Sequence, residues 1–389
     1  MIARIIILIL ILTILPEIYL YKHHIKRNCR KHPFIGWLWL LPGILMAVYA
    51  VVLAFSRHFA PANTLWINLF LLLSGVLTMP KAVYSFCSWV GLKWRKYRGS
   101  TRNWGNLVGV FLALFCVYAT IYGFTIGFRQ LEVKHVDLYF SDLPKAFEGY
   151  RIAQFSDLHI GTYTGSKAHL AQVALDSVQA QHADVIVFTG DIQNLQPMEI
   201  YPFRKSLAAL KARDCVFSVL GNHDYGDYVS EEPAIKVANE RETQGLERRM
   251  GWQLLMNEHA VLHRGKDSIV IAGEEDFIRR NGKQPADLSK TLTGVEDGAF
   301  VIMLQHDPQA WHKSILKSSK VQLTLSGHTH GGQFELFGMR FTRLLSRHDL
   351  GLYKQGECCL YVNAGIGGLV PFRFGMPSEI TVFTLHKKP

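Results

Sequence analysis

Residues 184–194 read DVIVFTGDIQN, a short apolar run that ends in a glycine and a carboxylate. Short apolar runs bounded by turn residues indicate buried strands. Five more such runs occur in the same half of the chain, at 150–156, 215–220, 268–273, 299–304 and 321–326. Between the first two, residues 166–182 carry apolar side chains at helical spacing, and residues 203–212 provide a second helical pattern. The alternation predicts an α/β fold around a largely buried sheet.

Polar residues follow five of the six predicted strands at the point where each strand ends. The motifs are DLHIG, GDIQN, GNHD, QHDP and GHTHGG. Alone, GNHD at 221–224 would read as an ordinary turn, because Gly, Asn and Asp favour loops. The carboxyl ends of strands in an open α/β sheet form its ligand crevice, so we expect the five motifs to converge. They supply seven candidate metal ligands: Asp157, His159, Asp191, Asn222, His306, His328 and His330.

These seven side chains have the chemistry of a divalent metal site. Carboxylates, imidazoles and an amide oxygen suit ions of intermediate hardness such as Mn, Fe, Zn or Co. Seven groups exceed the needs of one tetrahedral ion and suffice for two ions that share a carboxylate. Asp157 and His159 are two residues apart, as are His328 and His330. Both members of each pair would face the same way if the extended backbone continued through them.

As an ordered set, these motifs resemble those of the calcineurin-like metallophosphoesterases over about residues 148–385. The C-terminal pattern from GLYKQGECC to PFRFGMPSEITVFTL is similar to the membrane-associated bacterial branch of this family, which includes exported phosphodiesterases. The resemblance implies a four-layer α/β/β/α sandwich. It also implies two divalent metal ions, one held by Asp157, His159 and His330 and the other by Asn222, His306 and His328. Asp191 would bridge the two ions.

The resemblance also gives His223 a role as the proton donor to the leaving group, while two ions sharing a hydroxide would supply the nucleophile. One residue departs from the family pattern. Much of the family has an acid shortly after the second motif that orients this histidine, and this chain has Asn194 there. Two interpretations stay open. Either the Asn194 amide orients His223 by accepting a weaker hydrogen bond from its imidazole, or Asp224 takes over the orienting role.

The first third of the chain has the composition of a membrane domain. Four apolar segments, at about 4–21, 36–55, 65–86 and 105–127, approach or exceed the roughly 20 residues that span a bilayer as a helix. Pro80 and Lys81 interrupt the third segment, so its span could end near Thr78 and continue along the interface. We therefore expect a transmembrane domain at 1–130, a linker or first strand at 131–147 and the metallophosphoesterase domain at 148–389.

The charge of the chain lies almost wholly in this membrane domain. Residues 1–130 hold 14 Lys and Arg against one acid, Glu17, and the remaining 28 basic and 30 acidic residues nearly cancel. The basic residues flank apolar segments, so their partner is a lipid surface rather than nucleic acid. The loops at 21–32 and 92–102 each carry five Lys or Arg, whereas the loop at 56–64 carries only Arg57. By the positive-inside rule, the catalytic domain would lie outside the cytoplasm.

Together these observations predict a multi-pass, membrane-anchored dinuclear metal phosphoesterase. Its substrate would be a phosphodiester or phosphomonoester, expected to be lipid-linked or part of the cell envelope. Two alternatives stay open. One is a cytoplasm-facing hydrolase of a nucleotide-lipid pyrophosphate, which requires the opposite topology. The other is a non-catalytic membrane sensor or scaffold, although a domain without activity would not be expected to retain all seven ligands.

Overall fold

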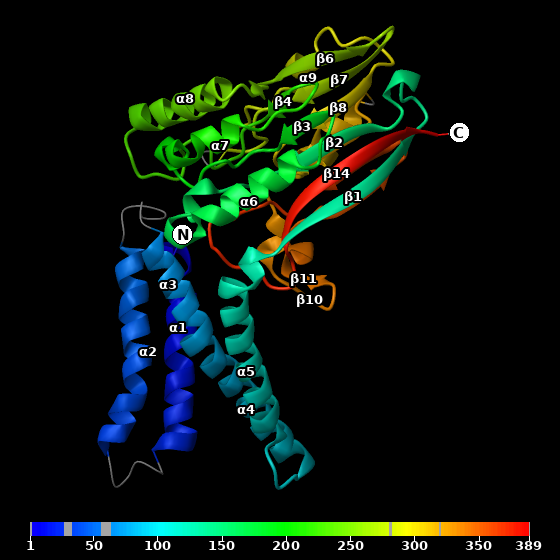
Figure 1. Cartoon of the computed structure of the whole chain (residues 1–389). Helices are drawn as coiled ribbons and strands as arrows, with labels where there is room; N and C mark the ends of the chain where they lie inside the picture. The colour runs from blue at the N-terminus through cyan, green and yellow to red at the C-terminus, as the bar shows by residue number, and fades with distance from the viewer. Residues whose placement is uncertain (1, 27–32, 56–63, 280–281, 319, 389) are drawn as a thin grey trace. The chain divides into compact units, whose positions relative to one another are not determined.

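The computed structural model describes residues 2–26, 33–55, 64–279, 282–318 and 320–388 (Figure 1). The chain divides into two compact units, Met1–Ile126 and Gly127–Pro389. The first unit is helical, and the second contains every strand that the structure describes.

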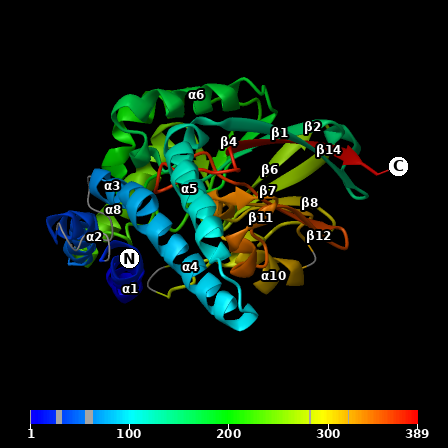
Figure 2. The ribbon, with the colours of Figure 1, turned by 90° about the horizontal axis from the view of Figure 1, so that it is seen from below.

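The helical unit contains four segments long and apolar enough to cross a membrane, as the sequence predicts. Its helices are α1 (Ile2–Leu20), α2 (Pro33–Ala54), α3 (Leu65–Leu73), α4 (Met79–Arg98) and α5 (Trp104–Thr125). Helices α4 and α5 pack side by side, and α1 packs against both α2 and α4 (Figures 1 and 2). An ion pair joins α1 to α4, with Lys81 Nζ 2.5 Å from Glu17 Oε1. These two largely buried ionisable side chains therefore neutralise each other.

The helix of the third apolar segment continues past Thr78, the residue near which the sequence allowed its membrane span to end. Helix continues from α3 into α4 through a π-helical turn at Ser74–Thr78 and ends at Arg98. Pro80 lies in the first turn of α4. Proline lacks a backbone N–H and its ring clashes with the carbonyl four residues before it, so it normally kinks or breaks a helix. The wider π turn just before Pro80 accommodates it, and the segment stays helical.

The second unit is built on two six-stranded sheets. The first sheet has the strand order β1 (Leu131–Phe140), β14 (Ser378–Lys387), β2 (Tyr150–Phe155), β3 (Val185–Phe188), β4 (Val216–Ser218) and β5 (Gln253–Leu254). The second has the order β12 (Gly351–Gln355), β13 (Cys358–Val362), β9 (Leu323–Ser326), β8 (Phe300–Leu304), β7 (Asp267–Gly273) and β6 (Glu258–Arg264). All six strands predicted from sequence are present, three neighbouring parallel strands in each sheet.

Side-chain alternation along the strands creates the layers. In β3, Val185 and Val187 face a core shared with the second sheet, whereas Ile186 and Phe188 face the opposite way. That outer face is covered by α6 (Ala168–Gln179), α7 (Arg204–Ala208) and α8 (Pro233–Arg249). The outer face of the second sheet packs against α9 (Leu288–Thr291) and α10 (Gln309–Lys313). The result is the expected α/β/β/α sandwich.

A buried carboxyl of α8 makes the stability of this sandwich depend on pH. Glu247 is fully buried, and its Oε2 accepts a hydrogen bond from Ser218 Oγ of β4. Burial raises the pKa of Glu247 from 4.5 to about 8. The folded chain therefore binds more protons than the unfolded chain between these two values, so its stability should fall as pH rises from about 4.5 to about 8.

We expect Glu247→Gln to reduce this loss of stability, by up to about 5 kcal/mol at pH 8. The measurement is the thermal unfolding midpoint of the full chain in detergent between pH 5 and 8.5. Other buried carboxyls can titrate in this range, so the diagnostic quantity is the difference in pH slope between the variant and the parent chain. Glu242→Gln, a less buried position on the same helix, is the matched control. Equal slopes for the parent chain and Glu247→Gln would contradict the prediction.

Candidate metal centre

The carboxyl ends of five strands from both sheets meet at one place and bring the candidate ligands together. In the first sheet, β2 leads to Asp157 and His159, β3 to Asp191, and β4 to Asn222. In the second sheet, β8 leads to His306 and β9 to His328 and His330. A continuous series of contacts links all seven residues. The site thus lies where two sheets meet, rather than along the edge of one.

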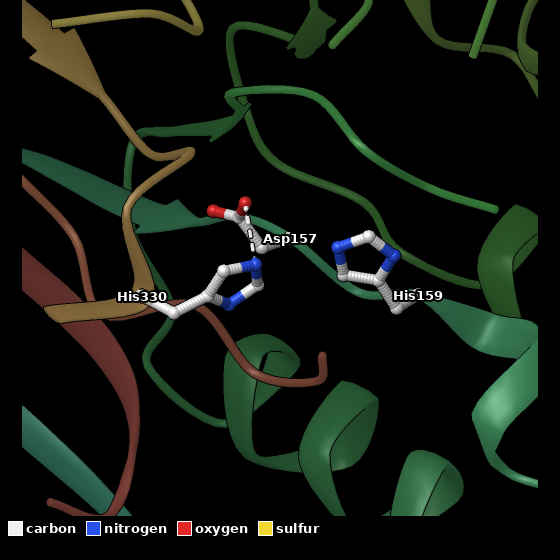
Figure 3. A group of neighbouring side chains, drawn as sticks. All are labelled: Asp157, His159 and His330. Atoms are coloured by element: carbon white, nitrogen blue, oxygen red, sulfur yellow. Dashed lines mark ion pairs between the residues drawn. The ribbon is translucent and has the colours of Figure 1, made fainter. Parts of the chain in front are cut away.

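Asp157, His159 and His330 form the first cluster (Figure 3). One potential ligand atom from each lies within 4.8 Å of the other two, and His330 Nε2 is 3.4 Å from Asp157 Oδ1. Burial, reinforced by the nearby His223, lowers the pKa of His159 to about 3, and burial holds the pKa of His330 well below its usual range. Both imidazoles are therefore neutral, which is the form that binds metal.

Asn222, His306 and His328 form the second cluster. Asn222 Oδ1 is 3.1 Å from His306 Nε2 and 2.7 Å from His328 Nδ1. The Asn222 amide is oriented by Tyr228, whose hydroxyl accepts a hydrogen bond from Nδ2 at 2.7 Å. His306 Nδ1 donates to the carbonyl of Thr189 at 2.7 Å, which turns Nε2 toward the cluster. Such an outer hydrogen bond is how proteins fix the orientation of a metal-binding imidazole.

Asp191 lies between the two clusters. Its Oδ2 is 3.6 Å from His159 Nε2 and 3.3 Å from His306 Nε2. Its Oδ1 accepts the backbone N–H of His223 at 2.8 Å. Burial would raise the pKa of Asp191, but His306 and His223 outweigh it and hold the pKa well below the usual range. An ionised carboxylate in contact with both groups is suited to join two cations.

The donor set therefore fits divalent metal ions. Burial alone would lower the pKa of His306, but the negative charge of Asp191 outweighs this effect and raises the pKa. His306 therefore holds a proton at a place where a metal cation would compete with that proton for the ring nitrogen. Oxygen and nitrogen atoms from carboxylates, imidazoles and an amide converge within a few ångströms.

The backbone at these ligands is left-handed rather than extended. Positive φ angles occur at five of the seven: Asp157, His159, Asp191, His328 and His330. The extended backbone that would align each two-residue pair is therefore not present at these positions. Non-glycine residues adopt this conformation only where the surrounding structure holds them there, and such strain is concentrated at functional sites. The tight turns, not strand continuation, make the paired side chains converge.

His223 is oriented by a group that neither sequence interpretation identified. Its Nδ1 lies 2.6 Å from the backbone carbonyl of Asn194, and its ring stacks on Tyr228 with centroids 4.1 Å apart. A carbonyl can only accept, so Nδ1 carries the hydrogen and Nε2 is left to exchange a proton. The side-chain amide of Asn194 instead lies 3.0 Å from Thr162 Oγ1. The proposed orienting role of the Asn194 side chain is therefore wrong.

Asp224 does not orient His223 either. Its carboxylate accepts four backbone N–H groups, from Gly221 in its own turn and from residues 191, 192 and 193. These bonds fix the loop after β3 against the loop after β4. Asp224 therefore acts on the backbone that carries Asp191, and its carboxylate has no hydrogen-bonding capacity left over for an imidazole.

Sequence reasoning missed Glu199, which holds the loop that carries the Asn194 carbonyl. The Glu199 carboxylate accepts the backbone N–H groups of Asn194, Leu195 and Gln196 at 2.6, 3.1 and 3.3 Å. Gln196 and Glu199 form a capping box across a single 3-10 turn. The spacing of Gln196 and Glu199 around Pro197 is the signal that could have found this cap.

Two acids of the segment GEEDF at 273–277 are withdrawn from solvent. Glu274 and Asp276 are buried, and Glu274 Oε2 accepts from Gln305 Nε2 at 3.0 Å. Burial raises the pKa of each of these two side chains to about 7. Both follow β7, which runs beside β8, the strand that leads to His306.

Arg373 is a further residue that sequence reasoning missed. Its side chain is fully buried, and its guanidinium donates to the carbonyls of residues 364, 365, 367 and 377 at 2.7 to 3.1 Å. This segment packs behind the first cluster, because Gly367 N–H donates to the Asp157 carbonyl at 2.8 Å. At Gly365 a Cβ would lie 2.7 Å from Asp157 Cβ, so the loop approaches as closely as glycine allows. Arg373 thus supports the position of Asp157 from behind.

We expect Arg373→Met to destabilise the fold by about 3 kcal/mol, because carbonyls that now accept from a charged donor would lose it. Burial lowers the Arg373 pKa only to about 10, so the wild-type side chain is charged at neutral pH. The thermal unfolding midpoint and the metal content of the full chain are the measurements. Arg373→Lys, which keeps the charge but has fewer donors, should be intermediate. An unchanged midpoint and metal content in Arg373→Met would contradict this role.

Comparisons with known proteins agree with this site. The profile of the calcineurin-like phosphoesterase family matches residues 150–332, and that of a probable calcineurin-like phosphoesterase transmembrane domain matches residues 3–128. The uncharacterised metallophosphoesterase YkuE of Bacillus subtilis is 34% identical over 267 residues, which cover 66% of this chain and 86% of YkuE.

Two relatives are similar at lower identity. A transmembrane protein with metallophosphoesterase domain from Danio rerio is 29% identical over 360 residues, covering 90% of this chain and 74% of that protein. The UDP-2,3-diacylglucosamine pyrophosphatase LpxG of Chlamydia muridarum is 28% identical over 299 residues, covering 64% of this chain and 88% of LpxG.

Proposed function

Because this chain belongs to the calcineurin-like metallophosphoesterase family and carries a membrane domain, we propose that it hydrolyses a phosphate ester of a lipid-linked or cell-envelope substrate. The observation that carries the proposal is the convergence of seven oxygen and nitrogen ligands from the strand ends of two sheets. A sensor or scaffold without activity would not need this set, nor the outer hydrogen bonds that orient it.

We assign the ligands to two divalent ions, of Mn, Fe, Zn or Co. Asp157, His159 and His330 would hold one ion. Asn222, His306 and His328 would hold the other, with Asp191 between them. When bound, such ions supply an activated water nucleophile and neutralise charge on the phosphate oxygens.

The protein's own groups account for the rest of the proposed mechanism. His223 holds its Nδ1 hydrogen on the Asn194 carbonyl and offers Nε2 as the atom that protonates the leaving oxygen. Tyr228 stacks on the His223 ring and bonds the Asn222 amide, so one side chain positions both residues. Asp224 and Glu199 fix the two loops that carry Asp191 and the Asn194 carbonyl.

Hydrolysis assays of the purified full chain test the proposal. A chromogenic phosphodiester and a phosphomonoester should be hydrolysed after Mn²⁺ is added to chelator-treated protein, and not before. A folded, metal-loaded chain with no turnover on a broad panel of phosphate esters would instead favour the sensor or scaffold.

A second candidate reaction is hydrolysis of a nucleotide-lipid pyrophosphate. It is favoured by the similarity to LpxG, whose name describes it as a pyrophosphatase of UDP-2,3-diacylglucosamine. Release of UMP from that lipid, with no turnover of phosphate esters, would select this candidate.

Topology distinguishes the two candidates further. The positive loops at 21–32 and 92–102 support a catalytic domain outside the cytoplasm, because Lys and Arg favour the cytoplasmic side. Reporter fusions at the C-terminus measure the orientation directly. High activity of a reporter that works only in the cytoplasm would overturn the outside placement and favour the pyrophosphatase.

A further inference from the structure

A group of large apolar side chains is exposed on the small hairpin that follows His330. The hairpin comprises β10 (Glu335–Leu336) and β11 (Met339–Arg340) and continues into a 3-10 turn at Phe341–Leu344 (Figure 1). Within nine residues, five apolar side chains are between 66% and 90% exposed: Phe337, Met339, Phe341, Leu344 and Leu345. We call these five residues the hairpin patch. Exposed apolar groups scattered singly are ordinary, whereas a contiguous group marks an interaction site.

Ion pairs and a ring stack stabilise the segment that carries the hairpin patch. Arg340 Nη1 is 2.6 Å from Glu335 Oε2, and Arg340 Nε is 2.8 Å from Asp349 Oδ2. Behind it, the ring of Phe334 stacks on Phe374 with centroids 5.2 Å apart. The patch is thus presented by an ordered element, not by an unfolded loop.

Within residues 333–350, the segment that carries the hairpin patch, the exposed charge is basic. Both acids between residues 333 and 350, Glu335 and Asp349, are already paired with Arg340. Arg343 and Arg347 are exposed beside Leu344 and Leu345. Apolar side chains next to exposed arginines are the combination that binds the interface of an anionic bilayer.

The hairpin also packs against the loop that carries His330. A Cβ at Gly332 would lie 2.8 Å from Thr342 Cγ2, and one at Gly331 would lie 3.4 Å from Arg340 Cδ. Whatever surface contacts the hairpin patch is therefore brought close to the first ligand cluster.

We propose that the hairpin patch inserts into the interfacial layer of the membrane that anchors the protein, with Arg343 and Arg347 against anionic lipid headgroups. The membrane domain keeps a bilayer within reach of the chain at all times, so a lipid surface is the occupant at the highest local concentration. Insertion would hold lipid headgroups beside the metal centre. The contact does not depend on the reaction proposed above.

Depth-dependent quenching tests the insertion. An environment-sensitive fluorescent amino acid replaces Leu344 in the full chain, which is reconstituted in vesicles of phosphatidylcholine and phosphatidylglycerol. Val261, an apolar residue of β6 that is 44% exposed, is the control position. We expect blue-shifted emission at 344 and several-fold stronger quenching by a lipid-borne nitroxide than at 261. Equal emission and quenching at the two positions would overturn the proposal.

Two further outcomes separate the possible occupants. A blue shift at 344 that grows with the protein-to-lipid ratio and is not quenched by the lipid-borne nitroxide would assign the hairpin patch to a second copy of the chain, against our proposal.

The double variant Arg343→Gln with Arg347→Gln tests the contact with anionic lipid. It should show a smaller increase in quenching at 344 than the parent chain when phosphatidylglycerol is added. Lys266→Gln, an exposed change on the β6–β7 turn, should leave that gain unaltered. If phosphatidylglycerol increases the quenching of the double variant as much as that of the parent chain, the contact of Arg343 and Arg347 with anionic headgroups is refuted.

Discussion

Asp191→Ala should release metal from both clusters and lower hydrolysis by about 10⁴-fold or more, the scale seen when a catalytic unit loses an essential member. The Asp191 carboxylate is buried and lies within 3.6 Å of an imidazole from each cluster. It is the ionised group that would neutralise charge between the two proposed cations. Metal content per folded chain, together with turnover of a chromogenic phosphodiester, measures both effects.

Asp191 also accepts the backbone N–H of His223, so its loss could disturb the loop as well as the metals. Asp191→Asn separates the two effects, because the amide keeps an oxygen that can accept this hydrogen bond and lacks the charge. The asparagine variant should fold normally and still lose metal. Asp176→Ala, a change on the helix α6, controls for loss of charge alone. Retention of two metal ions per chain by both Asp191 variants would contradict the bridging role.

His223→Ala should keep the metal and lower the turnover number by about 10² to 10⁴, the usual contribution of a general acid. The loss should be greatest for substrates with poor leaving groups, since an alkoxide of high pKa needs the proton most. The measurement is a series of aryl and alkyl phosphate esters, with metal content determined on the same preparations.

The geometry also allows a second role for His223, that of a metal ligand. One of its ring nitrogens lies within 4.8 Å of potential ligand atoms of His159 and Asp191, which is close enough for it to bind metal. Loss of metal in His223→Ala would therefore identify it as a ligand. Equal slowing across good and poor leaving groups, with metal retained, would show that it does not act as the acid.

Local patterns were sufficient for the elements and for the candidate ligands. Apolar runs at 184–189 and 299–304 predict strands because a fully buried strand needs apolar residues on both faces, and both appear as β3 and β8. The four apolar segments predict spans because their length matches the hydrocarbon layer, and four suitable helices are present. The ligands are recognisable because each follows its strand directly.

Local sequence patterns do not predict contacts between segments that are far apart in the chain. The partner of His223 is a backbone carbonyl, which every residue carries, so no side-chain type signals it. Arg373 bonds four carbonyls through a fold-specific loop, and its residue type alone reads as a surface charge. The π turn that lets α3 continue into α4 depends on helix geometry beside Pro80, not on composition.

Periodicity and the residue chemistry next to each strand are therefore enough to indicate which elements form, how many segments suit a membrane, and which side chains are candidate metal ligands. How these side chains meet depends on the packing of the folded chain. Three neighbouring strands of the first sheet and two of the second deliver ligands to one place, left-handed turns aim them, and buried carboxylates and Arg373 hold the loops. Those arrangements depend on residues far apart in the chain, whose packing no local pattern records.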